Sequence, residues 1–206
     1  MKRPYLLILL LLISTTSCDQ LRNGNKDKVK WQVVEADGFR IRLPNYMTSL
    51  GEDFSPDATI GYGNNLKEIY AQVIVERKDE VDAYFANYED GAFANGLAGY
   101  ADFVMDNYRN ALEKTDRYSG QRTENIGPLL CKLFDLSGDM ITDQPFKGSK
   151  VKIYHAVNVV EGRAHYYQFS TWTLDKFRNK YQDLMNKILM SIEEVDGPTD
   201  TTTTAY

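Results

Sequence analysis

The sequence predicts an α+β fold, in which an antiparallel β-sheet is covered by helices on both faces as an α/β/α sandwich. The first observation is a β-hairpin, because residues 149–160 and 163–172 alternate in polarity around a turn at Glu161 and Gly162. The second is a pair of stretches, 98–114 and 174–192, in which apolar residues recur every three or four positions. These stretches are the two long helices available to cover the sheet.

The expected register of the hairpin explains why cover is needed on both sides. Pairing residue 160 with residue 163 places Val157 opposite Tyr166 on one face and Tyr154 opposite Phe169 on the other. Both faces therefore carry apolar pairs. A sheet that is apolar on both sides must be buried on both sides.

The remaining elements follow in chain order. Residues 31–35 and 39–43 form short strands joined by a hairpin signal at 36–38, residues 60–63 form a weak strand, and residues 69–77 form a stronger one. From Asp79 the pattern turns helical and becomes a firm helix over 98–114. Residues 129–137 return to strand, and Thr173 is the expected N-cap of the last helix.

The N-terminal segment predicts export and anchoring. Lys2 and Arg3 precede the apolar run 5–13, which is about half the roughly 20 residues that a membrane-spanning helix needs. A basic start, a short apolar stretch and small residues before Cys18 are typical of a secretory signal peptide. Residues 16–18, Thr-Ser-Cys, also resemble the end of a bacterial lipoprotein signal, although Thr15 replaces the usual aliphatic residue.

This resemblance implies a domain organisation and a location. Residues 1–17 would be removed as the lipoprotein signal peptide, and Cys18 would carry the lipid at the head of a flexible tether, 18–30. Residues 31–195 would form one globular domain, and 196–206 a disordered tail. The protein is then expected in the bacterial cell envelope, outside the cytoplasm and anchored to a membrane, with the outer membrane favoured. A net charge of −5 without a long basic run argues against nucleic acid as a partner.

Two further segments are similar to a known family. The opening stretch 39–46, FRIRLPNY, and the closing pattern of 153–154, 166–169 and 188–192 resemble the PsbP-like family. That family includes extrinsic photosystem proteins, DcrB-like bacterial envelope lipoproteins and a Ran-binding import factor. The resemblance implies the fold over residues 31–195 and a role in binding other proteins, without shared catalytic residues.

The residues that most often carry chemistry do not form a site in the sequence. His155 and His165 lie on opposite faces of the expected hairpin, so they cannot share a metal. Cys131 stands between Leu129 and Leu133 and is expected to be an inert buried thiol. The carboxylates at 135, 139 and 143 do not have the spacing of a calcium loop. We therefore expect no catalytic residues, no metal and no cofactor.

Two long loops are the candidate contacts with a partner. Residues 138–148 carry Met140, Ile141 and Phe146, and residues 50–65 carry Phe54 and Tyr62. In the alternative interpretation these side chains pack back onto the domain. The expected function is a non-catalytic protein-interaction module of the envelope that binds another envelope protein. The alternative is a carrier that holds a small apolar or aromatic ligand between sheet and helix.

Overall fold

The computed structural model describes residues 29–36, 38–51, 55–88, 93–142 and 149–195. Two compact units, Met1–Lys30 and Trp31–Tyr206, divide the chain, and every element below belongs to the second. Among the described residues, none of the helices has the length and apolar character needed to cross a membrane.

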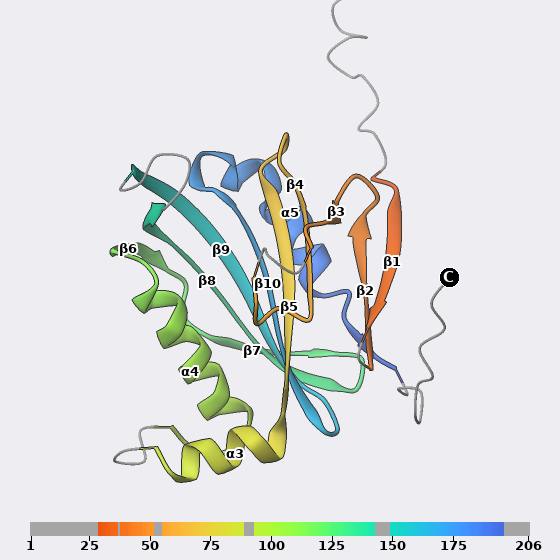
Figure 1. The fold of residues 1–206 in the computed structure, drawn as a ribbon, viewed down its shortest axis with the longest axis vertical. Helices are drawn as coiled ribbons and strands as arrows, with labels where there is room; N and C mark the ends of the chain where they lie inside the picture. The colour runs from red at the N-terminus through yellow and green to blue at the C-terminus, as the bar shows by residue number, and fades with distance from the viewer. Residues whose placement is uncertain (1–28, 37, 52–54, 89–92, 143–148, 196–206) are drawn as a thin grey trace, which may run out of the picture. The chain divides into compact units, whose positions relative to one another are not determined.

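Strands hold more residues of this unit than helices do (Figure 1). In chain order they are β1 (Trp31–Ala36), β2 (Phe39–Pro44), β3 (Thr48–Ser49), β4 (Ile60–Asn64), β5 (Ile69–Arg77), β6 (Lys114–Tyr118), β7 (Arg122–Ile126), β8 (Leu129–Thr142), β9 (Ser149–Glu161), β10 (His165–Leu174) and β11 (Glu193–Glu194). The helices are α3 (Lys78–Ala86), α4 (Leu97–Asn110) and α5 (Arg178–Leu189), with the 3-10 turn η3 (Asp175–Phe177) before α5.

These strands form two antiparallel sheets. The large sheet has the order β3-β4-β5-β10-β9-β8-β6, with β7 also paired to β8. The small sheet has the order β1-β2-β11. The first two strands form a hairpin, as the sequence predicts, with Ala36 paired with Phe39 and Trp31 with Pro44.

The large sheet is buried on both faces. One face packs against α3 and α4 in a cluster that includes Val104, Phe134 and Val157. The other face packs against α5 and the inner side of the small sheet, in a cluster that includes Phe39, Phe169 and Met185. In Figure 1, α4 lies on one side of β8 and β9, whereas α5 and the β1–β2 hairpin lie on the other.

The expected fold class, an α/β/α sandwich, is wrong. Strands predominate over helices, and a second sheet shares one face of the large sheet with α5, so helices do not cover both faces. The reason is visible in β2, where Phe39, Ile41 and Leu43 are buried while Arg40 and Arg42 are exposed. A strand that is apolar on one side only suits a covering layer, whereas β9 and β10 are buried on both sides.

The expected register of the β9–β10 hairpin is also wrong, by four residues. Tyr166 pairs with Glu161, and the Gly162 N–H donates to the His165 carbonyl oxygen over 2.9 Å, so Arg163 and Ala164 form the turn. A Cβ on Gly162 would lie 2.5 Å from Glu194 Oε1 and 2.6 Å from the Tyr167 ring, so this glycine provides space. Because the shift is even, each side chain keeps its predicted face.

Smaller predictions also differ from the structure. β8 continues through residues 138–142, which were expected in a loop, and the last helix, expected over 174–192, spans Arg178–Leu189. Helix α4 ends at Asn110 and not at residue 114, where the sequence predicts its end, because β6 already begins at Lys114. Thr173 does not cap the last helix. It lies in β10, where its Oγ1 donates to the Glu68 carbonyl oxygen over 2.7 Å. Strands β6 and β7 were not predicted, since both are polar and lack an apolar alternation.

Candidate functional site

The partner residues predicted from the sequence do not form one surface. Cys18, Phe54 and Phe146 lie outside the described residues, and Ile141 is described only by its backbone, which pairs with Lys150. Met140 is half-buried against the cluster under α4.

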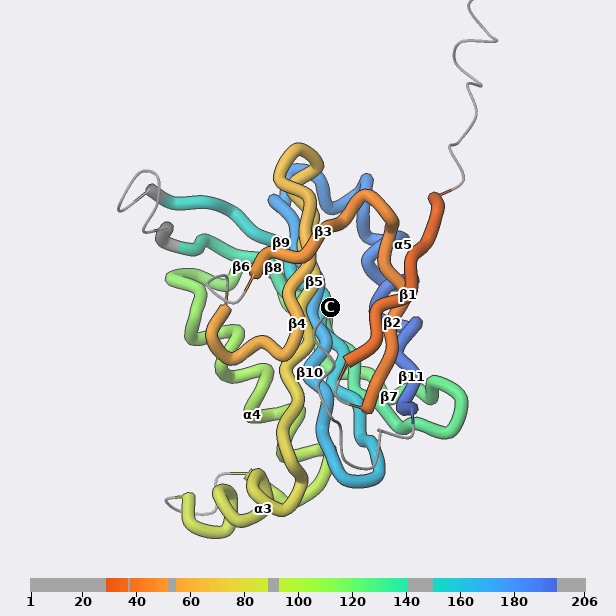
Figure 2. Tube along the Cα trace, turned by 45° about the vertical axis from the view of Figure 1, so that its right-hand side comes forward, coloured from red at the N-terminus to blue at the C-terminus, as the bar shows by residue number. Residues whose placement is uncertain are grey.

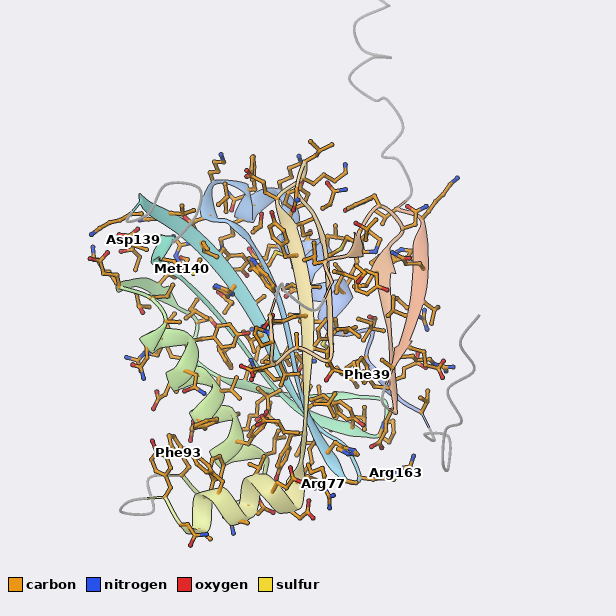
Figure 3. The ribbon with its side chains drawn as sticks, in the orientation of Figure 1. Phe39, Arg77, Phe93, Asp139, Met140 and Arg163 are labelled. Atoms are coloured by element: carbon orange, nitrogen blue, oxygen red, sulfur yellow. The ribbon has the colours of Figure 1, made fainter. Side chains whose placement is uncertain are left out.

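Tyr62 is half-buried against the cluster on the opposite face, so the structure does not bring it and Met140 together. Figure 3 also shows Met140 at the end of the large sheet remote from Arg163, which marks the site described below. The partner role of these residues therefore remains a prediction.

Cys131 and His155, a thiol and an imidazole that could form a nucleophile–base pair only if they met, lie on opposite faces of the large sheet. Cys131 is buried on the α5 face, where its Sγ–H donates to the Glu124 carbonyl oxygen over 3.3 Å. Burial, reinforced by the nearby Glu124 carboxylate, raises the pKa of its thiol to about 11. His155 lies on the α4 face between the rings of Tyr108 and Trp172, and burial lowers its pKa to about 4. Cys131 and His155 therefore cannot act as a pair.

No metal centre is present in the part of the chain that the structure describes. There, no three His, Cys, Asp or Glu side chains gather closely enough to hold an ion. The two histidines occupy opposite faces of the large sheet, as the alternation of the hairpin predicts.

A groove with a volume of about 1140 Å³ is the candidate site, and we call it the β8–β11 groove. Three segments form its walls: the β7–β8 turn, the β9–β10 turn, and the chain from the end of α5 through β11. Figure 2 shows the β7–β8 hairpin beside β11. Its lining residues are Trp31, Arg42, Lys78, 126–130, 161–163, Lys187 and 190–194.

Apolar side chains line part of the groove and remain accessible. Trp31 at the start of β1 and Leu130 at the start of β8 are each 40% exposed. Ile126 pairs with the buried Leu129 across the two-residue turn of Gly127 and Pro128. Because side chains alternate along a strand, the next residue, Leu130, points to the opposite side. Gly127 has φ +57°, a conformation that favours glycine, and it makes this tight turn possible. The groove can thus bury apolar surface of a ligand.

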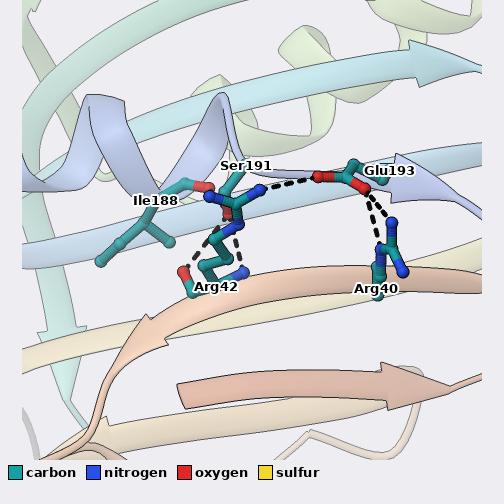
Figure 4. A network of polar contacts seen from close by, with 5 residues as sticks. All are labelled: Arg40, Arg42, Ile188, Ser191 and Glu193. Atoms are coloured by element: carbon teal, nitrogen blue, oxygen red, sulfur yellow. Dashed lines mark hydrogen bonds and ion pairs between the residues drawn. The ribbon is translucent and has the colours of Figure 1, made fainter. Parts of the chain in front are cut away.

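The carboxylates in the groove are already occupied by cations. Glu193 Oε2 accepts from Arg40 Nη2 over 2.6 Å and Nε over 2.8 Å, and its Oε1 accepts from Arg42 Nη2 over 3.0 Å (Figure 4). These hydrogen bonds lower the pKa of the Glu193 carboxylate, and the bonds from Arg40 contribute most. In the same network Ser191 Oγ accepts from the Arg42 N–H and donates to the Ile188 carbonyl oxygen, so it ties the end of α5 to β2.

The other two groove carboxylates are occupied in the same way. Glu194 Oε1 accepts from the Arg163 N–H over 2.9 Å and from the Tyr167 hydroxyl over 3.3 Å, and its Oε2 accepts from Arg163 Nε over 3.1 Å. Burial, together with Glu194, raises the pKa of Tyr167 to about 12, so its hydroxyl stays protonated as a donor. Glu161 accepts from Lys78 Nζ over 2.6 Å.

Among the described residues, one cation that lines the groove has no ion-pair partner. Four basic and three acidic side chains line the groove. Lys187 is exposed on the last turn of α5, and no carboxylate of the described residues lies within ion-pair distance of it. The groove therefore combines accessible apolar side chains with the exposed ammonium group of Lys187.

Sequence reasoning missed this groove because its walls are far apart in the chain. Trp31, Leu130 and Lys187 come from three separate regions. One local signal existed: Leu129 and Leu130 are adjacent in a strand, so their side chains point to opposite faces of the sheet.

Known proteins resemble the chain in structure only. No family model and no curated protein sequence matches it. Among solved structures, the cyanobacterial PsbP of Synechocystis sp. PCC 6803 has a TM-score of 0.50 at 12% identity, covering 83% of this chain and 96% of that one. LpqN of Mycobacterium tuberculosis, involved in cell envelope biogenesis, has a TM-score of 0.43 at 13% identity, covering 87% and 96%. The Ran-binding protein Mog1p of Saccharomyces cerevisiae has a TM-score of 0.47 at 11% identity, covering 82% and 97%.

Identity at this level is informative about the fold alone. The similarity to the cyanobacterial protein extends over most of both chains and agrees with the resemblance of the opening and closing segments. The chain has a PsbP-like fold.

Proposed function

We propose that this protein is a non-catalytic interaction module of the bacterial envelope, anchored through lipid on Cys18, and that its β8–β11 groove binds an acidic segment of another envelope protein. The observation that carries the proposal is the combination of exposed Trp31 and Leu130 with the cation Lys187, which has no ion-pair partner in the described part of the chain. Aromatic and aliphatic anchors surrounded by charge are typical of protein-binding surfaces.

The charge of the groove favours an acidic partner. Its three carboxylates already accept from Arg40, Arg42, Arg163 and Lys78, so a partner's cation would have to displace an existing pair. A partner's carboxylate instead meets Lys187 without displacing anything. The excess of positive charge is local, since the whole chain carries −5, and such local patches steer partners of opposite charge.

The reactive groups of the chain support a non-catalytic role. With a pKa of about 11, Cys131 is a thiol and not a thiolate at neutral pH, and it has no contact with the groove. His155, with a pKa of about 4, is neutral and lies on the other face of the large sheet. Neither group is placed to act on a ligand in the groove.

A charge reversal with a matched control tests the proposal. Lys187→Glu should reduce capture of the partner in intact cells by cross-linking at least about tenfold, because it replaces an attraction by a repulsion. Lys180→Glu makes the same change on the same helix outside the groove lining and should leave capture unchanged. Equal loss in both variants, or none in either, would show that the groove is not the docking site.

The anchor and the alternative function have separate tests. Intact mass and acyl labelling of the wild type and Cys18→Ala decide whether the mature protein begins at a lipidated Cys18; a soluble wild type that begins elsewhere contradicts the anchor. The carrier alternative has a site with enough room, since the groove, at about 1140 Å³, exceeds the about 300–1,000 Å³ of small-molecule sites. Retention of a small molecule in native mass spectrometry, with no protein captured, would favour the carrier.

A further inference from the structure

Strand β1 has a free edge in the described structure. It is the outer strand of the order β1-β2-β11, and no described residue pairs with its other side. Figure 2 shows β2 between β1 and β11. On the face that points away from the core, Val33 is 64% exposed and Trp31 is 40% exposed. An open strand edge carries unpaired N–H and C=O groups that can pair with another strand.

The other described edges are protected, whereas β1 is not. β3 and β11 have two residues each, β6 and β7 carry charged side chains along their length, and β6 also has an irregular register between Thr115 and Arg117. Short length, charge and bulges are the usual protections against edge pairing. β1 has six residues, WQVVEA, with Glu35 as its one charge and no proline or glycine.

We propose that β1 pairs antiparallel with β1 of a second copy of this chain, with Val33 of one copy opposite Val33 of the other. The pairing joins the two small sheets into one continuous six-stranded sheet. It goes beyond the proposed function and rests on it only for the membrane anchor at Cys18, which intact mass tests separately; it does not depend on the identity of a partner in the groove.

The face pattern of β1 selects this register. Directly opposed residues of antiparallel strands share a face, so an exposed residue must meet an exposed residue. Centring the pair on Glu35 places two like charges opposite each other, which is unfavourable. Centring it on Gln32 pairs only residues 31–33 of each strand, whereas centring it on Val33 or Val34 pairs five residues of each. Centring it on Val34 places the exposed Val33 opposite the charged Glu35. Centring it on Val33 pairs Val33 with itself and Trp31 with Glu35, and it opposes no like charges.

The symmetry of the pair has a consequence for binding. A two-fold axis perpendicular to the joined sheet puts both outer faces on the same side. Trp31 and Arg42 lie on that face and line the groove. The dimer therefore presents two β8–β11 grooves to one side, an arrangement that suits a bivalent partner.

The interface is small, so we expect a weak pair in dilute solution. One added strand of this length buries less than the roughly 1,200 Å² of a stable interface. Confinement to a membrane raises the effective concentration, so the pair should form where the chain is anchored.

A disulfide trap in the full chain tests the register. Val33→Cys should give a disulfide dimer after oxidation of cell membranes, because directly opposed residues lie within bonding reach. Glu35→Cys is the matched control: it is equally exposed on the same strand, but its copies are then roughly four residues apart along the pair and out of reach. The wild type gives the background from the buried Cys131, since a lipidated Cys18 has no free thiol.

We expect about tenfold more dimer from Val33→Cys than from Glu35→Cys, in line with the steep distance limit of disulfides. Equal trapping of both variants means random collision, and more trapping from Glu35→Cys means another register. Either result overturns the proposal, as does trapping of Val33→Cys at the wild-type level.

Charge substitutions provide a second test with a rescue. Two epitope-tagged copies that both carry Val33→Lys should no longer capture each other after chemical cross-linking, because like charges then face each other. One Val33→Lys copy and one Val33→Glu copy should capture each other at the wild-type level or better. Unchanged melting of each variant verifies that this exposed position leaves the fold intact. Equal capture by the like-charged and opposite-charged pairs contradicts β1–β1 pairing.

Discussion

Truncating Met185 tests how strongly α5 is attached to the large sheet. Met185 is 0% exposed and belongs to the cluster between α5 and the sheet. Met185→Ala removes the thioether and leaves a cavity, because the close-packed surroundings relax only in part. Substitutions of this kind cost about 2–5 kcal/mol of unfolding free energy. A loss of about 3 kcal/mol in a unit of this size lowers Tm by roughly 6–12 °C.

The control for this prediction lies two residues away. Asp183 is exposed on the same helix, so Asp183→Ala should change the unfolding free energy by no more than about 0.5 kcal/mol. Urea unfolding followed by circular dichroism gives both values, and thermal melting gives the two shifts in Tm. If Met185→Ala costs less than about 1 kcal/mol, or no more than the control, α5 is not packed on the sheet as described, because buried truncations exceed that value.

Three further predictions follow from single groups. Burial lowers the pKa of His155 to about 4, so as the pH falls this side chain is protonated in the unfolded chain before it is protonated in the folded one. The free energy of unfolding should therefore drop as the pH falls from about 6.5 toward 4. In urea titrations at several pH values, His155→Gln should remove this residue's contribution to that pH dependence. Cys131, with a pKa of about 11, should resist an aqueous thiol reagent at pH 8 and react once urea unfolds the chain; fast labelling of the folded protein contradicts its burial. Ser191→Ala removes the acceptor of the Arg42 N–H and should cost about 1 kcal/mol, whereas an unchanged urea midpoint would show that this tie contributes nothing.

The sequence predicted most strands because alternation is a local property. Residues 69–77 are the bounds of β5, and the faces of His155, Tyr166 and Phe169 were placed correctly even though the hairpin register was wrong. A register error of an even number of residues leaves each side chain on the same face of the sheet, so faces are predicted more reliably than paired residues. The separation of Cys131 from His155 follows from the same property.

What the sequence could not provide was the grouping of strands into sheets. The alternation of 39–43 predicts a strand that is buried on one side, but it does not show which sheet the strand joins. That choice depends on β11, a two-residue strand with the polar sequence Glu-Glu that no pattern marks. The β8–β11 groove depends on the same long-range pairing, which places Glu193 beside Arg40 and Arg42.

Site-specific photo-cross-linking in intact cells tests the central claim, that the β8–β11 groove binds a protein. A photoreactive aromatic residue at Leu130 should cross-link to one recurrent protein, within a segment rich in Asp and Glu. The same residue at Leu66, which is 98% exposed in the turn between β4 and β5, is the control and should not capture that protein. The account is contradicted if Leu130 captures no recurrent protein, or if Leu66 captures the same one equally well.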